Sequence, residues 1–93
     1  MPTLVIPPPY RGPTGGVDEI AVPAGSVAEC LAAAEARFPG FRAQVVDPDG
    51  HVHAFVKLFR NGDQLTGDVL AARIGEEDRL EVLAAIAGGS GLR

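Results

Sequence analysis

Only one segment of this 93-residue sequence has the signals of a long helix, and short strand-like runs lie on both sides of it. Ser26-Val27-Ala28-Glu29 fits a capping box, in which Ser26 accepts from the amide three residues on and Glu29 reaches back to the Ser26 amide. Pro39-Gly40 is expected to end the helix. Apolar residues at helical spacing predict one buried stripe, made of Val27, Leu31, Ala34 and Phe38.

The strands are predicted from short apolar and β-branched runs that Pro, Gly, Asn or Asp residues interrupt. Three prolines after Ile6 end the first run, because proline has no amide hydrogen to donate. Asn61-Gly62 predicts a hairpin, since both central residues of that turn need positive φ. We expect strands at residues 3–6, 17–22, 51–60, 64–65 and 79–83, turns at 47–50 and 75–78, and a helical turn within 68–74.

This order of elements predicts a single α+β domain in which one helix crosses a small sheet. A chain of this size can remove roughly 60% of its unfolded surface from water, which suffices for one core. We expect the folded domain to cover residues 1–84 and a flexible tail to cover residues 85–93.

Charge and cysteine content restrict the environment and the partners. The formal net charge of -4 disfavours general nucleic-acid binding, which needs clustered Lys and Arg. Cys30 is the only cysteine and cannot form an internal disulfide, and we find neither a leader-like start nor an apolar run of membrane-spanning length. A cytoplasmic protein without a membrane partner is expected.

Several motifs that could bind metals or react have simpler readings. His51 and His53 lie on one side of a predicted strand, but no third ligand follows at a suitable spacing, so we predict solvated side chains and no metal site. Asp47-Pro48-Asp49-Gly50 lacks the later ligands of a calcium loop and is predicted to be a turn. Cys30 has no evident base and is predicted to be a small buried hydrophobe. The acidic run 76–78 either steers a basic partner or is a solvated turn.

The Gly88-Gly89 pair is the most informative feature after the last predicted strand. A chain end without β-carbons can thread a narrow enzyme channel, so Ile86, Ala87, Gly88 and Gly89 are candidates for that role. If Gly89 carried a terminal carboxylate, ATP could activate it. Ser90 follows instead, and the Gly89 carbonyl is then an amide, which cannot be adenylated. Any carrier function therefore requires cleavage between Gly89 and Ser90.

Two segments carry a resemblance to a known family. Residues 75–83, followed by Ala85-Ile86-Ala87-Gly88-Gly89, resemble the end of the ubiquitin-like sulfur carriers of the MoaD and ThiS group. Residues 55–63 resemble the strand and Asn-containing turn of the CysO-like branch. The resemblance implies a β-grasp roll with a mixed sheet, in which the first and last strands pair in parallel at the centre.

The resemblance also implies a chemical cycle with several partners. A JAMM-type metallopeptidase would remove Ser90-Gly91-Leu92-Arg93, an extension that masks the diglycine. A ubiquitin-activating-type adenylyltransferase, similar to MoeB and ThiF, would use ATP and Mg²⁺ to adenylate Gly89. Sulfide would then give a thiocarboxylate that donates sulfur to an accepting synthase, with cysteine or a related metabolite preferred. The chain would be a carrier with no bound cofactor, not an enzyme.

Two other functions stay open at this point. A β-grasp modifier could be joined to lysines of target proteins through Gly89, or the chain could be a plain interaction domain. The alternation of the third predicted strand places Phe55, Lys57 and Phe59 on one face and Val56 and Leu58 on the other. Either the first face is a partner surface, or its Phe side belongs to the core.

Overall fold

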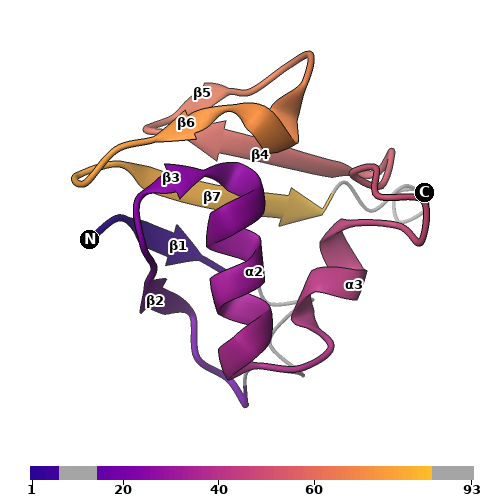
Figure 1. Cartoon of the computed structure of the whole chain (residues 1–93), viewed down its shortest axis with the longest axis horizontal. Coiled ribbons are helices and arrows are strands. Elements are labelled where there is room, and N and C mark those ends of the chain that lie inside the picture. Colours follow the sequence, from indigo (N-terminus) through magenta and orange to yellow (C-terminus); the bar gives the residue numbers. More distant parts are fainter. Residues whose placement is uncertain (7–14, 85–93) are drawn as a thin grey trace, which may run out of the picture.

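The fold is a mixed β-sheet covered on one face by a helix. The computed structural model describes residues 1–6 and 15–84. Figure 1 shows the helix α2 in front of the sheet. In chain order the elements are β1 (Thr3–Val5), β2 (Glu19–Ala21), β3 (Gly25–Ser26), α2 (Val27–Arg37), α3 (Phe41–Val45), β4 (Val56–Arg60), β5 (Asp63–Gln64), the 3₁₀ turn η2 (Val69–Ala71), β6 (Arg73–Ile74) and β7 (Arg79–Ala84).

The first and last strands described lie together at the centre of the main sheet. Its strand order is β2-β1-β7-β4-β5, and β1 pairs with β7 in parallel with Leu4 opposite Leu80. The other pairings in this sheet are antiparallel. This arrangement confirms the predicted β-grasp roll, including its parallel central pair.

The capping box at the start of α2 is present as predicted. Ser26 N–H donates to Glu29 Oε1 at 2.8 Å, and Glu29 N–H donates to Ser26 Oγ at 3.1 Å. These two bonds satisfy amides that the first helical turn leaves without partners. The helix ends at Arg37, so Phe38 is its half-buried C-cap residue and not the fourth member of the buried stripe.

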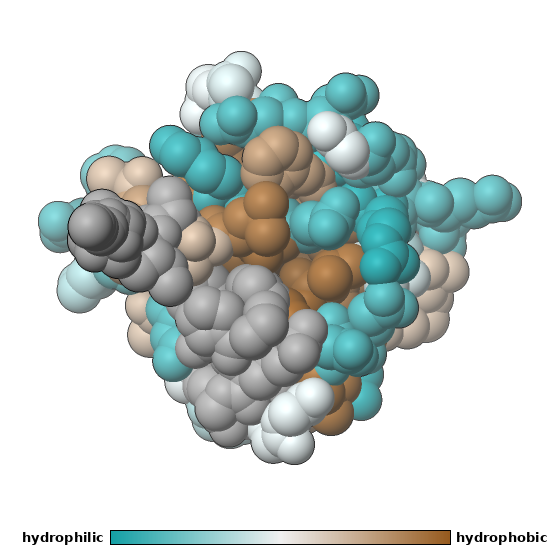
Figure 2. Space-filling view, turned by 180° about the vertical axis from the view of Figure 1, so that it is seen from behind, coloured by the Kyte–Doolittle hydropathy of each residue, from teal (hydrophilic) through white to brown (hydrophobic). Residues whose placement is uncertain are grey.

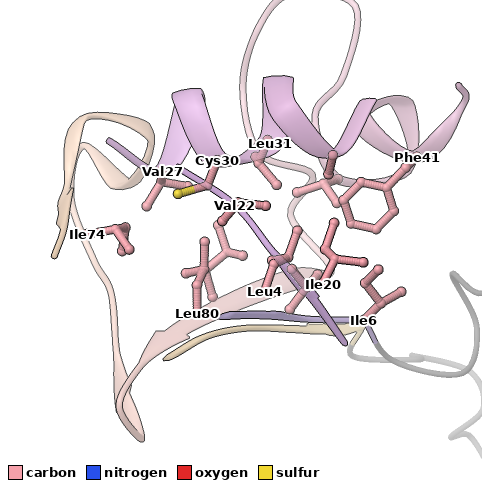
Figure 3. Packing of buried hydrophobic residues seen from close by; sticks show 14 of the residues in the cluster. Leu4, Ile6, Ile20, Val22, Val27, Cys30, Leu31, Phe41, Ile74 and Leu80 are labelled. Carbon is pink, nitrogen blue, oxygen red and sulfur yellow. The ribbon is translucent and has the colours of Figure 1, made fainter. Parts of the chain in front are cut away.

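The core lies between α2 and the facing side of the sheet (Figure 3). Leu31 and Ala34 of α2 are fully buried against strand residues such as Leu4 and Leu80. Phe41, at the start of α3, is the largest fully buried side chain. Burial of such residues supplies the main favourable term in folding, at roughly 25 cal/mol per Å² of apolar surface. The remaining buried hydrophobic residues are Ile6, Ile20, Val22, Val27, Cys30, Val45, Val46, Val56, Leu58, Ile74 and Val82.

Three local features differ from the expectations. The predicted strand over residues 51–60 is wrong in its first half: β4 starts at Val56, and Val52 forms only an isolated bridge to Val46. The helix α3 was not predicted, since five residues are too few to show helical periodicity. The two-residue strands β3 and β6, which form a separate small sheet, were not predicted either.

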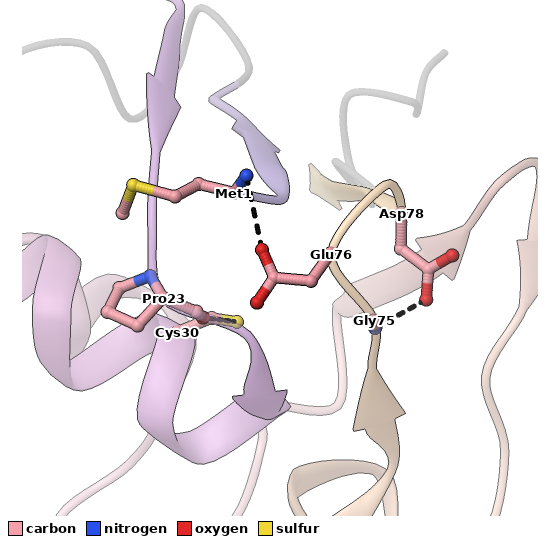
Figure 4. A network of polar contacts seen from close by, with 6 residues as sticks. All are labelled: Met1, Pro23, Cys30, Gly75, Glu76 and Asp78. Carbon is pink, nitrogen blue, oxygen red and sulfur yellow. Dashed lines mark hydrogen bonds and ion pairs between the residues drawn. The ribbon is translucent and has the colours of Figure 1, made fainter.

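The predicted hairpin turn is confirmed in its backbone. Asn61 and Gly62 both have positive φ, at 53° and 88°. The Asn61 side chain has a second role, because its Oδ1 accepts from Arg79 N–H at 2.8 Å and its Nδ2 donates to Asp78 Oδ1 at 2.8 Å. Asp78 Oδ2 accepts from Gly75 N–H at 2.7 Å (Figure 4). We call these three bonds the turn clasp. The two bonds of Asn61 join the β4–β5 turn to the β6–β7 turn and the start of β7, and the Gly75 bond closes the β6–β7 turn itself.

Candidate docking face and carboxy-terminal site

The predicted reactive residues follow directly after the last described strand. Ile86, Ala87, Gly88, Gly89 and Ser90 all lie outside the described residues. β7 ends at Ala84, which is opposite Val56 at the start of β4. The roles of these five residues therefore stay predictions.

The sheet face turned away from α2, which we call the open face, carries both apolar and charged side chains. In β7, Leu80 and Val82 are buried, whereas Leu83 is 46% exposed. Because side chains alternate along a strand, Glu81 shares the open face with Leu83. Val5 and Phe59 lie on either side of Glu81 in the strand register, and both are partly exposed. Seen from behind the view of Figure 1, an apolar area is bordered by polar residues (Figure 2).

The structure answers the question that the alternation of Phe55, Lys57 and Phe59 left open. Val56 and Leu58 are the core residues, at 4% and 2% exposed. Lys57 is exposed and Phe59 is partly exposed, so these two side chains belong to the open face. Phe55 precedes β4 and is 47% exposed.

Phe55 is held by a histidine from the preceding turn. Its ring stacks on that of His53, with centroids 4.9 Å apart and an interplanar angle of 15°. His53 Nε2 lies 3.1 Å from the carbonyl oxygen of Ala43, which follows the start of α3. An exposed aromatic ring held in one place loses little conformational freedom when a partner covers it.

The β7 side of the open face was missed by sequence reasoning. Leu83, Glu81 and Val5 were assigned to strands, but their common face was not considered. The alternation of Leu80 and Val82 with Arg79 and Glu81 held the signal, because it fixes which side of β7 points away from the core.

Two charged groups at the edge of the open face form an ion pair. Arg79 contacts Glu19 across β1, with Nη2 and Oε2 2.6 Å apart. The hydrogen bond that Arg79 donates to Glu19 raises the pKa of the Arg79 guanidinium, and the Glu19 charge adds to this effect. Both side chains are about half exposed, so the pair contributes little to stability. Its main effect is to fix the charge pattern beside the apolar centre of this face.

The other candidate residues have structural surroundings. Cys30 is fully buried, and its Sγ lies 3.4 Å from the carbonyl oxygen of Pro23, to which the thiol donates (Figure 4). Burial raises the pKa of this thiol, with a smaller contribution from Glu29. Glu76 forms an ion pair of 3.3 Å with the amino group of Met1. In residues 1–6 and 15–84, no cluster of three or more potential metal ligands occurs.

The turn at residues 47–50 is confirmed and is built around one carboxylate. Asp47 Oδ1 accepts from the amides of Asp49 and His51, at 2.9 and 3.0 Å. The hydrogen bond from His51 is the main reason that the pKa of Asp47 is lowered. As for membrane association, none of the helices in the described part of the chain is both long and apolar enough to span a bilayer.

Fold and surface together define this chain as a ubiquitin-like β-grasp protein. No family model matches the sequence. The sulfur carrier protein CysO of Mycobacterium tuberculosis is 29% identical over 90 residues, which cover 94% of this chain and 97% of CysO. Together with the structural similarities given next, this match makes the chain similar to the ubiquitin-like sulfur carriers.

Solved structures show the same similarity. The crystal structure of M. tuberculosis CysO has a TM-score of 0.85 at 26% identity and covers 92% of this chain and 100% of that one. CysO in the BexX/CysO complex of Amycolatopsis orientalis has a TM-score of 0.87 at 29% identity, covering 96% and 100%. SAMP1 of Haloferax volcanii shares the fold, with a TM-score of 0.74 at 20% identity and coverage of 95% and 98%. The CysO similarities support a sulfur carrier role.

Proposed function

We propose that this protein carries sulfur as a thiocarboxylate on Gly89. The similarity to CysO over nearly the whole chain, together with Gly88-Gly89 shortly after β7, is the observation that carries this proposal. In this scheme the chain itself catalyses none of the reaction steps. It presents one acyl carbon to a series of enzymes.

The chemistry begins with hydrolysis of the Gly89–Ser90 amide, which adds water and releases the peptide Ser-Gly-Leu-Arg. The new Gly89 carboxylate attacks the α-phosphate of ATP in an activating enzyme, giving an acyl-adenylate and pyrophosphate. Sulfide then attacks the Gly89 carbonyl carbon and expels AMP. The thiocarboxylate formed is the nucleophile that delivers sulfur to the acceptor.

The open face is proposed as the surface that the activating enzyme binds while residues 86–89 enter the active site of that enzyme. An apolar centre with a polar border is typical of protein interfaces, in which aromatic residues are enriched. Leu83 and Lys57, which lie opposite each other, are the proposed contacts near the end of β7, with Phe59 opposite Glu81 and Phe55 just before β4. A partner bound there would hold the residues after Ala84 within reach of its catalytic centre.

Mass spectrometry of the chain, incubated with a JAMM-type peptidase, a MoeB-like enzyme, ATP, Mg²⁺ and sulfide, tests the proposal. We expect loss of Ser-Gly-Leu-Arg and then a gain equal to the mass difference between sulfur and oxygen. Gly89→Ala should prevent activation, and Gly91→Ala, inside the released peptide, is the matched control. Trimming without a sulfur gain, or a ladder of lysine conjugates in place of the thiocarboxylate, would contradict sulfur carriage.

A further inference from the structure

A groove that shares Lys57 with the open face runs along the outer edge of β4. It has a volume of about 490 Å³. One wall is the segment from Gly50 to Ala54, the other runs from Gln64 to Leu70, and β4 supplies Val56, Lys57 and Leu58 between them. The strand β5 pairs only with Phe59 and Arg60, so among the residues that the structure describes the first three residues of β4 have no strand neighbour on this side (Figure 1).

Two backbone groups of β4 point into this groove and have no partner in the described part of the chain. Asn61 N–H donates to the Arg79 carbonyl on β7. Because backbone groups alternate in direction along a strand, the N–H and C=O groups of the odd-numbered residues of β4 point to β7, and those of the even-numbered residues point to the groove. Val56 N–H donates to His53, and Leu58 C=O accepts from Leu65 N–H. Within the described residues, the Val56 carbonyl and the Leu58 amide have no hydrogen-bond partner. They offer one acceptor and one donor, two residues apart, to an added strand.

The groove also has an apolar side. Leu65, Val69 and Leu70 are partly buried and pack against the core. Side chains of an added strand that lie opposite Val56 and Leu58 would point to the same side as those two core residues, because paired residues share a face. That is the side on which η2 packs against α2. Apolar side chains at these two positions would therefore cover Leu65, Val69 and Leu70.

Lys57 determines which residue of the added strand fits between those two positions. Its side chain is exposed on the other face, and it is the only lysine in the sequence. A second copy of this chain, paired through the same edge about Lys57, would place two lysines directly opposite each other, which is destabilising. A carboxylate at that position forms an ion pair instead. Asp68 is the carboxylate in the groove wall and would repel an acidic residue near η2. An acidic residue of the added strand therefore fits opposite Lys57 better than near η2.

We propose that the outer edge of β4 is a second docking site, which binds an extended segment of a partner protein with the pattern apolar, acidic, apolar. The segment adds a strand to the sheet through the Val56 carbonyl and the Leu58 amide. Its acidic side chain pairs with Lys57, and its apolar side chains fill the groove against Leu65, Val69 and Leu70. This site does not depend on Gly89 or on sulfur chemistry.

The test uses the full ¹⁵N-labelled chain and a capped peptide, Thr-Val-Val-Asp-Val-Val-Thr, in an NMR titration. We expect the largest shifts at Leu58, Leu65 and Val69, and an affinity at least ten-fold higher than for the same peptide with Lys in place of Asp. Lys57→Glu should reverse this preference. Arg37→Glu, an equal charge change on the exposed end of α2, should leave it unchanged. N-methylation of the two valines beside the aspartate should abolish binding.

Four results would overturn the proposal. One is no shift at millimolar peptide. Another is a set of shifts centred on Leu83 and Phe59, which would place the peptide on the open face. A third is equal binding of the N-methylated peptide, which would show that no strand is added. Concentration-dependent dimers in analytical ultracentrifugation that block the peptide would also contradict it, because the edge would then belong to a second copy.

Discussion

Asn61 and Asp78, seventeen residues apart, are joined by a hydrogen bond of 2.8 Å between Nδ2 and Oδ1. With the bond from Arg79 N–H to Asn61 Oδ1, this contact makes the β4–β5 turn and the start of β7 one unit. Asn61 thus serves the hairpin with its backbone and the neighbouring turn with its side chain. Both roles favour asparagine, because few other residues accept positive φ and also offer an acceptor and a donor.

Asn61→Asp is expected to lower the free energy of unfolding by about 1–2 kcal/mol. The new carboxylate can still accept from Arg79 N–H, but it faces Asp78 as a like charge in place of a donor. Gln64→Glu is the matched control, since it adds the same charge to an exposed residue of β5 outside the clasp. Urea unfolding at neutral pH measures both variants. Equal stabilities for the two would show that the clasp contributes nothing.

Stability is expected to fall as pH is lowered through the acidic range. Backbone hydrogen bonds from Gly40 and Arg42 lower the pKa of Glu35, and the bond from Gly75 lowers that of Asp78. Groups with lowered folded pKa values bind fewer protons in the native state, so stability rises with pH. Their contribution is complete above the ordinary values, 4.5 for Glu and 3.8 for Asp, and is lost as pH falls below them.

Urea unfolding between pH 7 and pH 3 checks this dependence. Glu35→Gln should flatten the acidic fall. Glu77→Gln should not, because it removes an exposed carboxylate that makes no hydrogen bond or ion pair in the described structure. An unchanged slope in Glu35→Gln would contradict the assignment.

Phe41→Ala is expected to cost about 3–5 kcal/mol, because it removes the largest fully buried side chain and leaves a cavity. Phe55→Ala makes the same chemical change at a position that is 47% exposed, and we expect it to cost less than about 1 kcal/mol. Thermal unfolding of the two variants measures the contrast. Similar losses in both would mean that α3 does not complete the core.

The Cys30 thiol is expected to resist modification in the folded protein. It is fully buried, and its raised pKa lowers the fraction of reactive thiolate. Reaction with an aromatic disulfide reagent should be at least ten-fold slower in buffer than in urea. Cys30→Ala combined with Ala32→Cys moves the thiol to an exposed position of α2 and should react fast in both solutions. Fast reaction of native Cys30 would indicate that this end of α2 opens.

Leu83→Asp is expected to reduce kcat/KM for adenylation of the trimmed carrier about ten-fold or more, if the open face is the enzyme's contact. Ala32→Asp, on the exposed side of α2, is the control with the same new charge. Pyrophosphate release measures both, and circular dichroism verifies that each variant is folded. Equal adenylation rates for the two variants would show that the enzyme does not contact the carrier through the open face.

Much of the fold could be predicted because its signals are local. The capping box at Ser26 and Glu29 and the positive φ of Asn61 and Gly62 depend on residues within a few positions of each other, so sequence alone reveals them. The strand before Val56 was predicted too long because His51 to Phe55 are β-prone, whereas the turn that Asp47 organises sets where pairing begins. The pair β3–β6 is two residues long, which is too short for any pattern.

The candidate site was predictable to a smaller extent. The alternation along β4 separated Lys57 and Phe59 from the core, but it could not show which face was buried, because both are partly apolar. The joint surface with Leu83 depends on β7 lying beside β4, a contact between distant parts of the chain. Gly89 and its neighbours stay predictions that rest on sequence and similarity.

The parallel pairing of β1 with β7 has a consequence for how the chain folds. Thr3 meets Arg79, so the middle of the sheet cannot form until nearly the whole domain is available, and the entropy of closing that long loop must be overcome first. A chain cleaved within its first six residues would lose a central strand of the sheet and not an edge strand. Damage at the amino end should therefore be as harmful to folding as damage to the strand that leads to Gly89.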